Sequence, residues 1–106
     1  MALDWDSIRD DAVSAAKQAL GGGWNAVSGG VTAQIAALVD LANYIEDHRA
    51  SISDDEYSML MQHQRICLQS VLTGYKQISY AVAKNVVGQV VTVLLAAVPG
   101  ILGLAA

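Results

Sequence analysis

The chain is poor in cysteine, which forms disulfides, and in the charged residues that most enzymes use. It has one cysteine (Cys67), one proline and no phenylalanine, and only 15% of its 106 residues are charged. A single cysteine excludes an internal disulfide and weakly favours a reducing compartment. Cys67 lies among apolar residues, so we expect a buried, unreactive thiol.

What is present is mostly apolar. Hydrophobic residues make up 54% of the chain, whereas soluble domains usually have about 45–50% apolar and about 25% charged residues. One small domain has few charges with which to cover its surface, so we expect part of that surface to meet another chain or a lipid.

Acidic residues are absent after Glu56. Residues 1–56 hold ten acids and three bases, a net charge of −7, whereas residues 57–106 hold three bases and no acid. The overall charge of −4 argues against nucleic acid as a partner. The asymmetry allows the two halves to pair, or copies to stack head to tail.

Sets of residues that would support catalysis or metal binding are also missing. Glu46, Asp47 and His48 are consecutive, so they point in different directions on a helix, and no Glu-x-x-His pair suggests a di-metal site. We expect His63 to be exposed or capping. The Gly21–Gly23 run has no following Lys and Ser or Thr, as a phosphate-binding loop would. We therefore predict a non-enzymatic protein with no catalytic residue, cofactor or metal.

Apolar residues recur at the spacing of an α-helix along most of the chain. Together the patterns predict an all-α fold in one domain over residues 1–106, with helices at about 4–20, 24–48 and 53–98. Ser53 and Glu56 form a capping box that starts the last helix. Two faces are expected to be apolar: Val31, Ile35, Leu38, Ala42 and Ile45 in the second helix, and Tyr57, Leu60, Gln64, Cys67, Val71, Tyr75, Ile78, Val82 and Val86 in the third.

The glycines allow two interpretations. Gly21–Gly23 either breaks the first helical arm or forms part of a seam with Gly22, Ala26 and Gly30 at every fourth position. We favour the break, because each interior glycine costs about 1 kcal/mol relative to alanine.

The turn near residue 51 lies almost midway along the chain. The two arms are therefore expected to form a long antiparallel helical hairpin. In that register Gly74 would meet Gly29 or Gly30, and Gly88 would meet Ala15.

Residues 85–106 carry no charge, and about 20 apolar residues suffice to cross a bilayer. Lys76 and Lys84 precede this segment, as cationic residues flanking a membrane span do. Asn85, Gln89, three glycines and the proline argue against insertion. The β-branched residues over 86–93 also leave a short strand open.

The leading hypothesis is a structural or interaction subunit that self-assembles through apolar helices into a homo-oligomer, tube or filament. The alternatives are a membrane-active protein that inserts residues 85–106, and a soluble helical module that binds another protein. The chain start has no basic or long apolar stretch, so we expect no signal peptide and a cytoplasmic, particle-bound or membrane location. The expected assembly or membrane interface comprises Trp5, Trp24, Gly22, Ala26, Gly30, Gly74, Gly88, Val90, Leu94, Leu95, Val98, Ile101 and Leu102.

Overall fold

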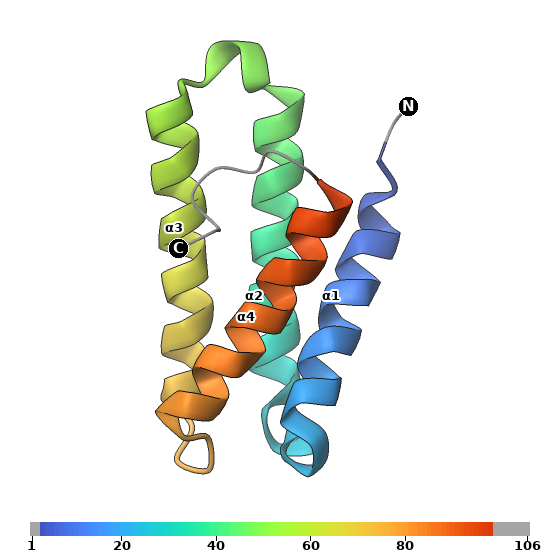
Figure 1. Cartoon of the computed structure of the whole chain (residues 1–106), viewed down its shortest axis with the longest axis vertical. Helices are drawn as coiled ribbons and strands as arrows, with labels where there is room; N and C mark the ends of the chain where they lie inside the picture. Colours follow the sequence, from blue (N-terminus) through green and yellow to red (C-terminus); the bar gives the residue numbers. More distant parts are fainter. Residues whose placement is uncertain (1–2, 99–106) are drawn as a thin grey trace.

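Four α-helices make up the computed structural model, which describes residues 3–98. They are α1 (Trp5–Leu20), α2 (Trp24–Asp47), α3 (Asp54–Thr73) and α4 (Tyr80–Ala97), with short 3₁₀ turns at Gly21–Gly23 and Arg49–Ser51. Figure 1 shows that successive helices run in opposite directions. The all-α prediction is confirmed, and residues 86–93 are helical rather than a strand.

Three of the four helices begin at a side-chain cap. The carboxylate of Asp4 accepts a hydrogen bond from the Ser7 N–H at 3.1 Å. The hydroxyl of Ser53 accepts one from the Glu56 N–H at 3.1 Å, as predicted. A third cap at Ser79 starts α4. Each cap satisfies a backbone donor that has no partner within its helix.

The first arm breaks at the triple glycine, as predicted. Gly21 has φ +56°, in the left-handed region where a side chain would clash with the backbone. Its N–H still donates to the Lys17 carbonyl, which ends α1. The chain then reverses and enters α2.

The prediction of one continuous helix over residues 53–98 is wrong. The helix ends at Thr73, the Gly74 N–H donates to the Ser70 carbonyl at 3.0 Å, and α4 begins only at Tyr80. The reversal lays α4 against α1. Within the bundle Val86, Val87 and Val90 of α4 are buried, each contributing about 1.5–3 kcal/mol. A straight helix would leave that face in water, and this burial outweighs the helical hydrogen bonds lost at the turn.

The bundle is a long hairpin folded in half. Glu46 faces Tyr57 across the top of the α2–α3 pair, and Gly30 faces Tyr75 near its foot. The α1–α4 pair continues this register, since Ala15 and Gln89 line one hollow. The α1–α2 and α3–α4 reversals lie at the same end of the bundle (Figure 1). The bundle is therefore only 42 Å long.

The four helices do not pack equally. α1 and α4 make the most extensive contact, and among the pairs that are neighbours in the bundle α3 and α4 make the least. Figure 1 shows why, because α4 runs diagonally from the foot of α3 toward the upper part of α1. The upper halves of α3 and α4 therefore diverge.

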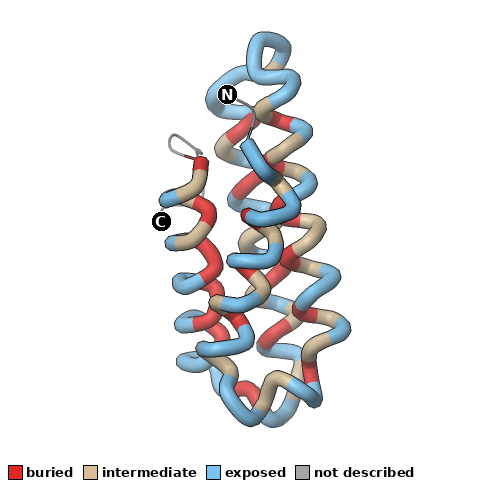
Figure 2. The backbone as a smooth tube through the Cα atoms, turned by 90° about the vertical axis from the view of Figure 1, so that its right-hand side faces the viewer, coloured by how far each residue is buried: buried red, intermediate tan, exposed pale blue. Residues whose placement is uncertain are grey.

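The core lies along the inner side of every helix, where buried residues form continuous bands in Figure 2. The stripe predicted for the second helix is confirmed, because its five residues are all buried. The face predicted for the third helix is rotated from the observed one. In α3 the buried residues are Tyr57, Met61, Leu68 and Leu72.

Candidate interaction surface

Three of the apolar residues predicted to form an interface lie inside the bundle. Val90, Leu94 and Val98 are buried, whereas Leu95 is half-buried. They hold α4 against the other helices, so they reach a partner only if α4 leaves the bundle. Ile101 and Leu102 lie outside the described residues.

The two tryptophans occupy the boundary between core and surface. Trp5 and Trp24 are half-buried and pack against the core. Trp24 also lines a hollow of about 400 Å³ between α1 and α2, beside Arg9 and Lys17. Their outer edges therefore remain accessible while their rings stabilise the bundle.

The predicted glycine seam divides into an inner and an outer part. Gly30 faces α3, where a Cβ would collide with the hydroxyl of Tyr75. The predicted close approach of Gly30 to Gly74 is therefore not found, because Gly30 meets the side chain of Tyr75 and Gly74 caps α3. Gly22 and Ala26 point away from the core and are exposed.

The outer side of α4 is uncharged over most of its length and built from small residues. Ala81, Gly88, Thr92 and Ala96 are exposed along it. Gly88 does not meet Ala15, as the hairpin register suggested, because a Cβ at this position would meet nothing within 4 Å. This side of α4 can therefore accept another helix at short distance.

The outer side of α2 has the same character, and Ala26 is its one residue that the predicted interface included. Ala26, Gly29 and Ala33 are exposed there. The signal was present, since residues 18–39 form a second stretch of 22 positions without charge. The charges gather instead on α1 and around the α2–α3 turn.

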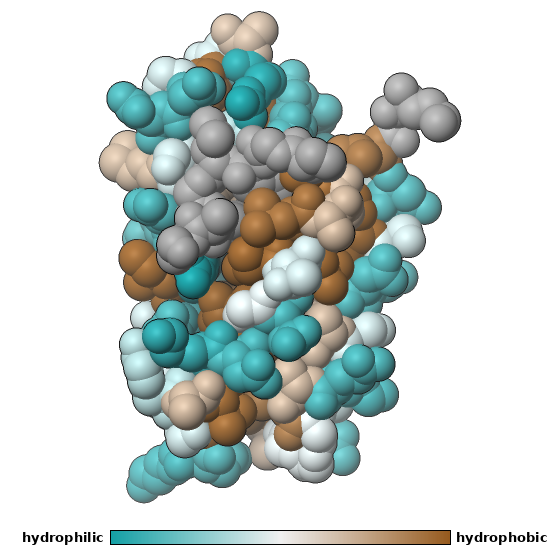
Figure 3. All heavy atoms as spheres, in the orientation of Figure 1, coloured by the Kyte–Doolittle hydropathy of each residue, from teal (hydrophilic) through white to brown (hydrophobic). Residues whose placement is uncertain are grey.

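The hydropathy of the α4 face changes along its length. Figure 3 shows hydrophobic residues gathered toward the upper end of α4, where it diverges from α3, and hydrophilic residues toward its lower end. Val93, Leu95 and Ala97 contribute, because each is only partly buried. Partly buried apolar residues of α4 thus lie near its C-terminal end, whereas Tyr80 and Val82 at its start are exposed.

A charged cluster closes the α2–α3 turn. The hydroxyl of Tyr57 donates to Glu46 Oε1 at 2.8 Å, and the guanidinium of Arg49 lies 4.5 Å from the Tyr57 ring centroid. Arg49 also pairs with Glu46 at 3.8 Å and with Asp54 at 3.6 Å. Burial, together with the hydrogen bond and negative charge of Glu46, raises the pKa of Tyr57. These polar residues therefore have a structural role at the α2–α3 turn.

The surface hollows are shallow. The hollow between α1 and α4 measures about 280 Å³ and is lined by Ala15, Gln18, Ala19, Asn85 and Gln89. Amides and methyl groups provide neither a nucleophile nor a general base. Within residues 3–98, no group of three or more His, Cys, Asp and Glu side chains is placed to hold a metal ion.

Cys67 is not buried, contrary to the sequence expectation. It is half-exposed on α3, and its Sγ lies 3.7 Å from Nε2 of His63, one turn earlier. His63 is exposed, as expected. The apolar neighbours that suggested burial of Cys67 are divided between the two sides of the helix, since Leu68 is buried and Ile66 is exposed.

The chain matches no protein family, curated protein or solved structure with which it was compared. Among the helices of residues 3–98, one is long and apolar enough to cross a membrane by length and composition alone. It is α4, with a mean hydropathy of 1.5 and a third of its residues buried. Core helices of soluble bundles have the same properties.

Proposed function

We propose that this chain is a non-enzymatic subunit that self-assembles into a homo-oligomer, tube or filament through the outer sides of α2 and α4. The observation that carries the proposal is the run of small, uncharged, exposed residues on both helices. Small side chains let two helix backbones approach closely, so that many weak contacts add up.

Two further features support this proposal. α2 and α4 present such surfaces with few charges, Asp40 on α2 and Lys84 on α4, so copies can approach along these sides with little like-charge repulsion. Tyr80, at the start of α4, is 63% exposed, and exposed aromatic residues are common anchors at protein interfaces.

A charged substitution on the outer side of α4 tests the proposal. Gly88→Arg places a long cation where a side chain meets open space, so the fold should hold while assembly is blocked. Ser14→Arg is the matched control, because it adds the same charge to the exposed side of α1. We expect the wild type and Ser14→Arg to sediment as assemblies and Gly88→Arg as a monomer. A monomeric wild type at micromolar concentration would overturn the proposal.

A second candidate function is insertion of α4 into a membrane. Its 18 residues span about 27 Å at 1.5 Å per residue, close to the roughly 30 Å bilayer core. α1 could not follow, because Asp6, Asp10 and Asp11 would make crossing costly. α4 would therefore have to separate from α1.

Locking α4 to α1 tests this second function. Ala15→Cys and Gln89→Cys, in a Cys67→Ser background, place two thiols at one hollow. Oxidation should close the disulfide and abolish leakage of dye from liposomes, and reduction should restore it. Equal leakage in both states, or none in either, would exclude insertion of α4 alone.

A further inference from the structure

His63 and Cys67 form a preorganised pair of metal-ligating side chains. They lie one turn apart on α3, with 3.7 Å between Nε2 and Sγ. A tetrahedral zinc ion has Zn–S bonds of about 2.3 Å and Zn–N bonds of about 2.0–2.1 Å, which places the two ligand atoms about 3.6 Å apart. The pair therefore stands at the separation that such an ion requires.

The ligand types select the metal class. A thiolate and an imidazole favour soft or borderline ions such as zinc over magnesium and calcium, which take oxygen ligands. Structural zinc sites hold four protein ligands. Residues 3–98 place no third His, Cys, Asp or Glu beside this pair, so one chain supplies half a site.

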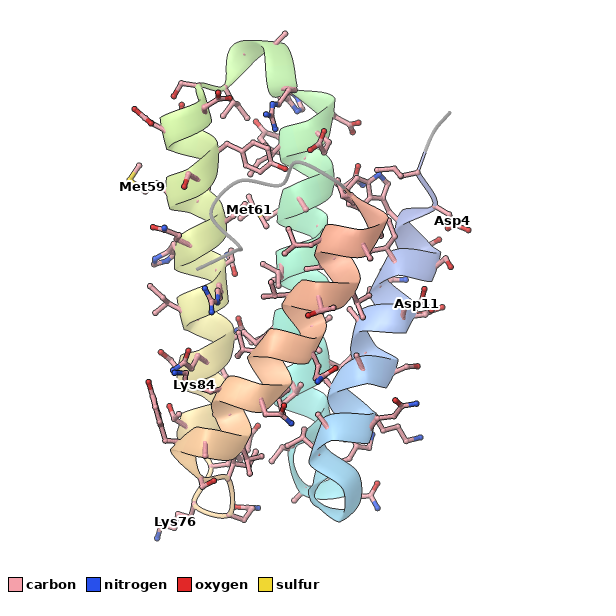
Figure 4. The ribbon with its side chains drawn as sticks, in the orientation of Figure 1. Asp4, Asp11, Met59, Met61, Lys76 and Lys84 are labelled. Atoms are coloured by element: carbon pink, nitrogen blue, oxygen red, sulfur yellow. The ribbon has the colours of Figure 1, made fainter. Side chains whose placement is uncertain are left out.

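The surface around the pair suits a second copy of the same helix. Met59 and Ile66, at 64% and 61%, are the two exposed large apolar side chains of α3. Figure 4 shows Met59 pointing outward from α3, whereas Met61 points into the bundle. Arg65 is the one charged residue over positions 57–73, so two α3 helices meet with little repulsion.

We propose that two copies of this chain bind one zinc-class ion between their α3 helices, each contributing His63 Nε2 and Cys67 Sγ. A twofold axis through the ion turns two half-sites into one Cys₂His₂ set. It also brings Met59 and Ile66 of each copy against the other. The inference goes beyond the proposed function, because it adds a metal-dependent contact on α3 to the proposed assembly through α2 and α4.

Cobalt substitution gives the direct test. The protein, kept reduced, is titrated with Co²⁺ and followed by absorption. A thiolate-to-cobalt charge-transfer band and tetrahedral d–d bands should grow and saturate at one ion per two chains. Zn²⁺ should displace the cobalt. Saturation at one ion per chain, or the absence of a thiolate band, would overturn the proposal.

Variants assign the ligands. Cys67→Ser should lose the charge-transfer band, and His63→Gln should lose the tetrahedral spectrum. His48→Gln is the matched control, because the only other histidine stacks on Tyr44 and should leave the titration unchanged. Circular dichroism confirms that the helices persist. An unchanged titration in either ligand variant would overturn the assignment.

Sedimentation separates this inference from the proposed function. In the Gly88→Arg background, Zn²⁺ should double the sedimenting mass, and a chelator should reverse the change. If the wild type assembles, and neither zinc nor His63→Gln changes its sedimenting mass, the metal site is wrong and the proposed function stands. If zinc dimerises a chain that otherwise stays monomeric, the metal site stands and the proposed assembly through α2 and α4 is wrong.

Discussion

Gly29 and Gly30 are neighbours in α2 that should respond oppositely to a methyl group. At Gly29 an added Cβ meets nothing within 4 Å. Alanine there should stabilise the fold by about 1 kcal/mol, the difference in helix propensity. For a domain of this size that raises the melting temperature by about 4 °C.

At Gly30 the same methyl group collides with the Tyr75 hydroxyl and lies close to Val71. We expect Gly30→Ala to lose the propensity gain, because the ring of Tyr75 must move out of its packed position. The two variants should therefore differ by about 1 kcal/mol, the propensity gain that Gly30→Ala loses. Tyr75→Phe removes the colliding oxygen, so Gly30→Ala should be tolerated better in that background.

The assay is thermal and urea unfolding followed by far-UV circular dichroism at one fixed protein concentration. A double-mutant cycle for positions 30 and 75 isolates their interaction. The α2–α3 packing described above would be refuted if Gly30→Ala stabilised as much as Gly29→Ala. It would equally be refuted if the cycle showed no coupling.

Three further changes test the helix starts, the turn cluster and the core. Ser79→Ala removes the cap of α4 and should cost about 1 kcal/mol in urea unfolding, as should Ser53→Ala for α3. Because folding raises the pKa of Tyr57, its contribution is complete below the unfolded value and is lost as pH rises above about 10. Stability measured against pH should show this alkaline loss in the wild type and not in Tyr57→Phe. Leu94→Ala should destabilise by about 2–5 kcal/mol, seen as a lower urea midpoint with an unchanged slope.

The sequence predicted what local chemistry determines. The cap at Ser53, the break at Gly21 and the buried stripe from Val31 to Ile45 each follow from a few adjacent or regularly spaced residues. The antiparallel pairing of α2 with α3 followed from the turn midway along the chain, but the predicted glycine contacts did not, since Gly30 meets Tyr75 and Gly88 meets no neighbour.

The reversal after Thr73 could not be read from the sequence in the same way. Gly74 alone costs a helix about 1 kcal/mol, and the segment has no proline. The reversal is determined by the packing of α4 against α1, which is a contact between residues far apart in the chain. Only the serine cap at Ser79 offered a local signal.

The interface prediction erred for a related reason. Hydropathy marks Val90 and Leu94 as apolar but does not say whether they are covered, and here both are buried in the bundle, in which α4 packs most extensively against α1. The pairing of His63 with Cys67 was overlooked because Cys67 was assigned to the inner face. A small rotation of the helix relative to the predicted stripe places it at the surface.

Both reversals, at Gly21–Gly23 and between α3 and α4, lie at the same end of the bundle. Rotation confined to these two bends would swing the α1–α4 pair away from the α2–α3 pair as one panel. Neither pair would lose its own packing. Each separated helix pair would then expose the surface that had packed against the other pair. The same surface would pack against the matching pair of another opened copy, so exchange of helix pairs would link chains without any new contact having to evolve.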